Sequence, residues 1–180
     1  MIKKFLKVCK KNKRCIITVA LTTLIGILTI ALFRNILVFL GFLVVNAFLN
    51  YYQGRMEFQF DLTPSLVLVI IFSIKLGLGY GLLFLFLGSV IPSVIAAGFN
   101  HMTFLFVGLA MFIAYLGSLG ITDNFLLYGL GLIVIQSVFG YFIARFFSGE
   151  PMTVFSVYLG FFLNIFYFLI LNGVILRILI

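Results

Sequence analysis

Very few side chains in this sequence could take part in chemistry. The acids are Glu57, Asp61, Asp123 and Glu150, and His101 is the one histidine. Hydrolytic and metal-dependent enzymes bring such groups together in recognisable spacings, such as H-E-x-x-H or G-x-S-x-G, and none of these motifs occurs here. The sequence therefore predicts that the protein is not an enzyme and that it holds neither a metal ion nor an organic cofactor.

All of these ionisable groups fall in connections between apolar runs. Ion-coupled pumps and intramembrane proteases carry an ionisable group within a membrane span, where the charge does the coupling or the chemistry. This arrangement favours neither class. His101 follows Asn100 in a polar connection and could contact a ligand, although a lone histidine there is more often an interfacial hydrogen-bonding residue.

Neutral polar side chains within the apolar runs are better candidates for a binding site. Asn46 and Asn50 are four residues apart and so share one helix face, Gln136 lies in a later run, and Asn164 and Asn172 lie in the last one. Each could line a ligand cavity inside a helix bundle. Interhelical hydrogen bonding, at about 0.6 kcal/mol per bond on average, is the simpler interpretation of any one of them.

The elements that position these residues must suit lipid. Of the 180 residues, 64% are hydrophobic and 9% are charged, whereas soluble domains have about half and a quarter. Uncharged runs of about 18 to 20 residues match the roughly 30 Å hydrocarbon core of a bilayer. We therefore predict an all-α fold: a polytopic transmembrane helical bundle of six to seven spans, multi-pass in the cell membrane.

The net charge of +8 is concentrated at the start of the chain. A basic cluster before a span sets topology, and it attracts anionic lipid by about 1 kcal/mol per Lys or Arg near the surface. We predict that residues 1–14 form a basic amphipathic segment in the cytoplasm that contacts anionic lipid and not nucleic acid. Residues 15–180 then form a single transmembrane helical domain. The cations of the N-terminal segment are Lys3, Lys4, Lys7, Lys10, Lys11, Lys13 and Arg14.

The boundaries of the spans follow from Gly, Pro, Asn and charged residues. Only Arg34 and Asn35 interrupt the first apolar tract, residues 15–52. Because an arginine at a helix centre costs roughly 2.5 to 3.5 kcal/mol, we expect a turn there between two helices. One crossing by this tract gives six spans and two give seven, and the remaining cations do not decide between them. Further spans are expected at residues 64–76, 81–97, 104–119, 125–146 and 153–176.

The segment "MEFQFDLTP", residues 56–64, departs from the apolar pattern. Glu57, Gln59 and Asp61 alternate with apolar residues at a period of two, which is typical of an extended chain. Thr63 can cap a helix, and proline suits a first helical turn because its missing N–H is not needed there. We therefore expect an extended segment that ends at Pro64, where the next span begins.

Residues 58–100 resemble a known family. The order is "FQFDLTPS", an apolar span, the Gly-rich turn "GLGYG" and the helix "GLLFLFLGSVIPSVIAAGF". It is similar to the core of S components, the substrate-binding subunits of energy-coupling factor transporters, and to the related rod-shape-determining membrane proteins. The resemblance implies a six-helix bundle in which an outward-facing loop, residues 54–61, closes over a small-molecule pocket. It also implies that separate subunits would supply ATP-driven uptake.

Two functions follow as hypotheses. The first is a small-molecule-binding subunit of an uptake transporter, whose ligand is unknown and whose site is lined by Asp61, Asn100, His101 and Asn164. Small residues of the first helix, which dock S components onto a partner membrane subunit, are irregularly spaced in this chain. The alternative is a non-transporting membrane scaffold in envelope or cell-shape assembly. It would associate with other membrane subunits through the small-residue face of residues 81–97 and the basic N-terminus.

Overall fold

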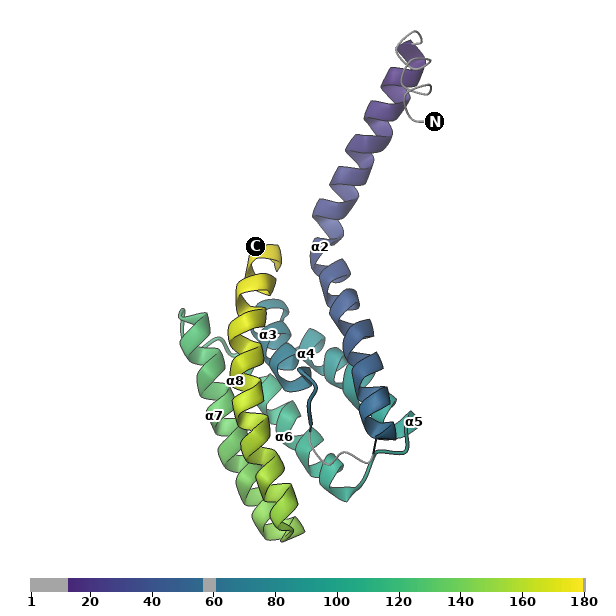
Figure 1. Ribbon diagram of the computed structural model, residues 1–180. Helices are drawn as coiled ribbons and strands as arrows, with labels where there is room; N and C mark the ends of the chain where they lie inside the picture. Colours follow the sequence, from purple (N-terminus) through teal and green to yellow (C-terminus); the bar gives the residue numbers. More distant parts are fainter. Residues whose placement is uncertain (1–12, 57–60, 180) are drawn as a thin grey trace. The chain divides into compact units, whose positions relative to one another are not determined.

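The computed structural model describes residues 13–56 and 61–179. The predicted basic segment, residues 1–14, and Glu57 and Gln59 of the predicted extended segment therefore lie almost wholly outside the described residues. In the described ranges the chain is helical apart from short connections, which confirms the all-α prediction there (Figure 1). The helices are α2 (Lys13–Arg55), α3 (Ser65–Leu76), α4 (Leu78–Leu85), the π-helical turn η1 (Phe86–Val90), α5 (Ile91–Ile95), α6 (His101–Ser118), α7 (Phe125–Ile143), the π-helical turn η2 (Ala144–Ser148) and α8 (Pro151–Leu179).

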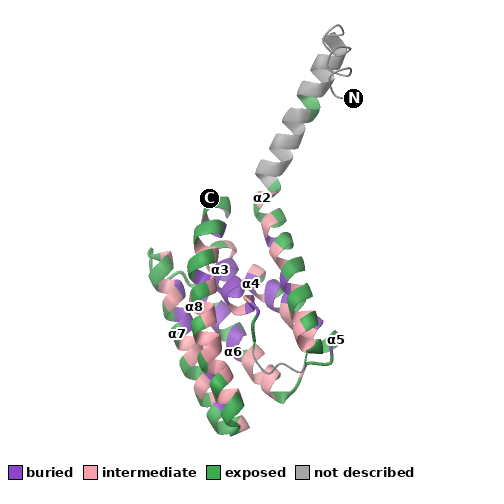
Figure 2. Ribbon diagram, viewed as in Figure 1, coloured by how far each residue is buried: buried purple, intermediate pink, exposed green. Residues whose placement is uncertain are grey.

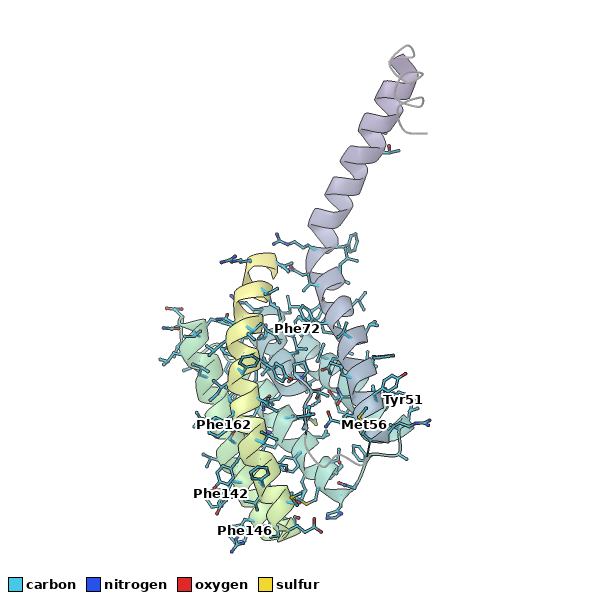
Figure 3. All side chains as sticks on the ribbon, viewed as in Figure 1. Tyr51, Met56, Phe72, Phe142, Phe146 and Phe162 are labelled. Carbon is cyan, nitrogen blue, oxygen red and sulfur yellow. The ribbon has the colours of Figure 1, made fainter. Side chains whose placement is uncertain are left out.

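Five helices of the described chain are long and apolar enough to cross a membrane. Their outer faces carry large exposed apolar side chains, and Phe142, Phe146 and Phe162 point away from α7, η2 and α8 (Figure 3). The chain is therefore an integral, multi-pass membrane protein, but the predicted six to seven spans are not confirmed. The five candidate spans are Phe33–Arg55, Leu78–Ile95, His101–Ser118, Phe125–Ser148 and Pro151–Ile175.

Helix α2 continues through Arg34 and Asn35, so the predicted turn at these residues is wrong. Neither residue breaks a helix as Gly or Pro would. Arg34 lies one residue inside the candidate span that starts at Phe33 and is only half-buried. Its long side chain can therefore carry the charge to the membrane surface without a turn in the backbone. Within the chain, Met1–Val38 and Phe39–Ile180 are separate compact units.

The core of the second unit is built around α3. Every side chain from Val67 to Ser73 is buried, and the helix packs against α4, α6, α7 and α8 (Figure 2). A helix that is apolar all round is stable only when other helices or lipid enclose it. With 12 residues, α3 is about 18 Å long, and so it is too short to cross a core of roughly 30 Å by itself.

The turn between α3 and α4 is shorter than the predicted Gly-rich turn "GLGYG", residues 77–81. Gly77 alone separates the two helices, with φ at +94°, which a residue with a side chain rarely adopts. The helices then run close together, because a Cβ on Gly81 would overlap the hydroxyl of Ser73. Small residues at such a crossing let the helix backbones approach closely in a membrane.

Asparagine caps set the starts of α6 and α7. The Asn100 carboxamide accepts from the Thr103 N–H at 2.9 Å, and the Thr103 hydroxyl faces back to the Asn100 N–H in a capping box. Asn124 accepts from the Leu127 N–H at 3.1 Å in the same way. The cap explains why α6 begins at residue 101, ahead of the predicted residue 104.

Candidate functional site

Polar groups from three parts of the second unit meet within the bundle. Asn46 and Asn50 come from α2, and the carbonyl of Gly88 and the hydroxyl of Ser89 come from η1. The third part is the segment that leads into α3. We call this set the polar cluster, and its members are Asn46, Asn50, Asp61, Thr63, Ser65, Ser89 and the Gly88 carbonyl.

The Gly88 carbonyl has no α-helical partner, because a proline lies one turn later. In an α-helix it would accept from the N–H of residue 92, and Pro92 has none. The side-chain amides of Asn46 and Asn50 donate to this carbonyl instead, at 3.0 Å and 3.1 Å. A backbone group at membrane depth must find such a partner, since no water is present to replace it. A Cβ on Gly88 would lie 3.3 Å from Asn46 Nδ2, so glycine keeps this approach open.

The asparagines of α2 also join the other members of the cluster. Asn46 is fully buried, donates to Ser89 Oγ at 3.3 Å and accepts from Ser65 Oγ at 3.2 Å. Asn50 donates to Ser65 Oγ at 2.8 Å. Asn46 lies nine residues, or about 14 Å, from Arg55 at the end of its candidate span, and so it is close to the bilayer midplane. The interhelical hydrogen-bonding interpretation of these two asparagines is confirmed.

Residues 61–64, which we call the lead-in segment, are not helical although they lie next to this buried cluster. The N–H of Leu62 donates to Gln53 Oε1 at 3.2 Å, and its carbonyl accepts from the Tyr167 hydroxyl at 2.9 Å. The carbonyl of Pro64 accepts from the N–H of Leu68 at 3.0 Å. Irregular backbone in a membrane protein needs hydrogen-bond partners of this kind.

Within the lead-in segment, Thr63 does not act as the predicted helix cap. Pro64 occupies the cap position, and no side chain caps α3. The Thr63 hydroxyl lies 2.7 Å from Asp61 Oδ1 and 2.7 Å from Ser65 Oγ. Asp61 Oδ1 also accepts from the Thr63 N–H at 2.9 Å. An unbroken chain of oxygens therefore leads from exposed Asp61 to buried Asn46.

Of the four predicted site residues, the structure brings only Asp61 to the polar cluster. Asn100 caps α6, His101 is exposed at the first residue of that helix, and Asn164 is half-buried on α8. No hydrogen bond joins any two of these four residues, all of which the structure describes. Thr63, Ser65 and Ser89 were not predicted as site residues. Pro92, four residues after Gly88, was the signal that could have pointed to the Gly88 carbonyl, because it removes the α-helical partner of that group.

The described residues also include polar atoms that lack hydrogen-bond partners. These are Ser73 Oγ, Gln136 Oε1 and Asn172 Oδ1, on α3, α7 and α8. A depression of about 160 Å³ lies elsewhere, and its lining is almost entirely apolar. It does not include any predicted site residue, and so it is a poor site for a polar solute. Its lining residues are Thr122, Leu127, Tyr128, Gly131, Leu132 and Ile135.

Comparisons with protein-family models, with curated proteins and with solved structures found no match. The resemblance of residues 58–100 to S components therefore stays a prediction. What the structure contributes is a largely buried polar cluster, joined to a lead-in segment that hydrogen bonds to Gln53, Tyr167 and Leu68 hold. Neutral hydrogen bonds make most of these contacts, so they can be exchanged without moving a charge into lipid.

Proposed function

We propose that the chain is the small-molecule-binding subunit of a membrane uptake transporter, resembling the S components. The observation that supports this function is the non-helical lead-in segment beside the buried polar cluster. Membrane transporters build solute sites from interrupted helices, because unpaired backbone groups and side chains there can bind a solute within the membrane. A scaffold would not need such a segment, because a long uninterrupted helix could provide the same packing.

In this proposal Asp61 lies at the exposed end of the site, and Asn100, His101 and Asn164 are further lining residues. The bonds that Gln53 and Tyr167 make to Leu62 hold the lead-in segment closed. A solute that enters the site would form its own hydrogen bonds in place of these two, each of which is worth about 1 kcal/mol. Uptake against a gradient would need separate membrane and ATPase subunits.

The test is a thermal-shift screen of the purified protein in detergent against vitamin-sized solutes. A specific ligand is expected to raise Tm by about 5 °C when it is well above its dissociation constant. Asp61→Ala and Asn164→Ala should lose this shift. Ser137→Ala is the matched control, because its hydroxyl bonds only to Ile133 of its own helix. A complete panel without any shift would overturn the proposed function.

The scaffold function has one observation in its favour. A Cβ on Gly108, Gly131 or Gly173 would meet nothing within 4 Å, and these glycines are exposed on α6, α7 and α8. Exposed glycines on lipid-facing helices can let a partner helix approach closely. By contrast, Gly81 and Gly88 of the predicted docking face are buried inside the bundle.

Leucine substitutions at the exposed glycines test the scaffold function. Gly131→Leu and Gly173→Leu should release a co-purifying membrane partner while leaving Tm of the isolated protein unchanged. Unchanged co-purification in both variants would remove the support for a scaffold.

A further inference from the structure

Two successive spans of the second unit run in the same direction: α2, and the span made by α4, η1 and α5. Phe39 of α2 packs against Tyr80 near the start of α4, with ring centroids 5.3 Å apart. Gly54, near the end of α2, lies close to Ala96, which follows α5, because a Cβ on Gly54 would be 2.7 Å from the Cβ of Ala96. Early residues of one span contact early residues of the other, and late residues contact late ones. The two spans are therefore parallel.

A chain with two parallel spans in succession has to cross back between them. At the start of α3, Ser65 Oγ accepts from Asn50 at 2.8 Å. Further along α3, Phe72 packs against Phe39, with ring centroids 5.1 Å apart. Helix α3 is therefore antiparallel to α2, and it supplies about 18 Å of the return. The lead-in segment supplies more of it, because it bonds to Gln53 close to the end of α2.

The end of α3 marks one end of the bundle, which we call the Lys75 end. Lys75 Nζ lies 5.0 Å from the ring centroid of Phe125, the first residue of α7. The hydroxyl of Tyr128, in the first turn of α7, donates to the Leu116 carbonyl near the end of α6. The connection between α6 and α7, which carries the exposed Asp123, therefore lies at the Lys75 end as well.

The opposite end of the bundle, which we call the His101 end, holds the starts of α6 and α8. Helix α7 runs back along α6 to this end, because a Cβ on Gly140 would lie 3.3 Å from the Phe106 ring. The connection from η2 to α8, with the exposed Glu150, therefore lies at the His101 end (Figure 1). The end of α2 at Arg55 lies there too, because it meets the chain just after α5.

We propose that the lead-in segment and α3 together make one membrane crossing, and that the polar cluster is entered from the His101 end. Asp61 is exposed at this end, where Asn100 and His101 also start α6. Three of the four predicted site residues thus share one aqueous face. From the Lys75 end, a solute would have to pass α3, whose side chains from Val67 to Ser73 are all buried. The entry of a solute rests on the proposed function, whereas the crossing rests on the helix contacts alone.

Cysteine labelling tests the crossing. Cys9 and Cys15 are first replaced by serine, and single cysteines are then labelled in sealed vesicles with a membrane-impermeant maleimide. Arg55→Cys and Lys75→Cys, both at exposed positions, should react from opposite sides of the membrane. Reaction from the same side would overturn the crossing, because a segment that does not cross returns to the side that it left.

Two further variants check the assignment of the ends. His101→Cys should react from the same side as Arg55→Cys, and Asp123→Cys from the same side as Lys75→Cys. Both positions are exposed in connections, outside the buried core. If His101→Cys and Asp123→Cys reacted from one side, α6 would not cross and the arrangement of the ends would be wrong.

Leu62→Cys tests the entrance. Leu62 is 46% exposed, and its substitution keeps the backbone bonds to Gln53 and Tyr167. The cysteine should react only from the side of His101→Cys. Reaction from the Lys75 side, or from neither side, would overturn the proposed entrance. No solute is used, so a thermal-shift screen without a ligand would overturn the proposed function and leave the crossing in place.

Discussion

Asn46 donates its side-chain amide to the carbonyl of Gly88, 42 residues later in the chain, at 3.0 Å. This bond joins α2 to the π-helical turn η1, where Pro92 leaves the Gly88 carbonyl without an α-helical partner. Three local features, an asparagine, a glycine and a proline, are therefore parts of one arrangement. It fixes the position of η1 against α2 and lets the polar cluster form beside it.

Replacing the buried amide should weaken the bundle. Asn46→Ala removes donors to Gly88 and Ser89 and leaves Ser65 without its acceptor, so we expect a loss of about 1 to 3 kcal/mol in unfolding free energy. The measurement is denaturant unfolding in detergent. Asn35→Ala, at an exposed asparagine of the same helix, should change the value by less than about 0.5 kcal/mol. Equal losses in the two variants would contradict the role of the bond.

Pro92→Ala should make the α2 amides less necessary. The new N–H can donate to the Gly88 carbonyl, which Asn50 otherwise serves at 3.1 Å. Asn50→Ala should therefore cost about 0.5 to 1 kcal/mol less in the Pro92→Ala protein than in the natural one. A double-mutant cycle of unfolding free energies measures this difference. A cycle without coupling would show that Pro92 does not determine how much the Gly88 carbonyl depends on Asn50.

The crossing of α3 and α4 should not tolerate a methyl group on one side. Gly81→Ala would overlap Ser73 Oγ, and we expect it to lower unfolding free energy by about 1 to 3 kcal/mol. Gly79→Ala is the matched control, because a Cβ there meets nothing within 4 Å, and it should be neutral or stabilising. Adding Ser73→Gly to Gly81→Ala should recover part of the loss. If Gly79→Ala proved as harmful as Gly81→Ala, overlap with Ser73 would not explain the loss.

Ala97 has a backbone conformation that favours glycine, with φ at +60°. It follows α5, and the neighbouring Gly98 donates its N–H to Ser93 at 2.9 Å. The left-handed region costs a residue with a side chain about 1 to 2 kcal/mol, and glycine loses only part of this gain to chain entropy. Ala97→Gly should therefore raise Tm by about 2 °C. Ala96→Gly, at φ −78°, should lower it. A decrease in both variants would refute the argument from backbone strain.

Hydropathy predicted the positions of the later helices of this chain well, because each is a largely apolar run between polar or glycine-containing breaks. It did not predict α2. We predicted a turn because burying the charge of Arg34 in lipid is costly. Arg34 lies at the edge of a span, however, so its long side chain can reach the membrane surface and no turn is needed. Hydropathy describes how readily a segment enters lipid, and continuity of the helix depends on the backbone.

The candidate site was harder to predict, because its contacts join residues that are far apart in the chain. The spacing of Asn46 and Asn50 indicated a shared face, but only packing shows that this face meets Gly88. Asp61 was predicted from its place in an unusual segment. Thr63 and Ser65 were not, since a hydroxyl next to a helix start is most simply interpreted as a cap.

The enclosed position of α3 has a consequence for how the protein is made. Its 12 residues are too few to span a bilayer alone, and most of the helices that enclose it come later in the chain. While the ribosome is still synthesising α6 to α8, α3 has few of its final neighbours. The innermost helix is thus among the first to be translated, and it can be enclosed only after the C-terminal helices have been made. A truncated chain would therefore leave α3 at the translocon without the helices that enclose it.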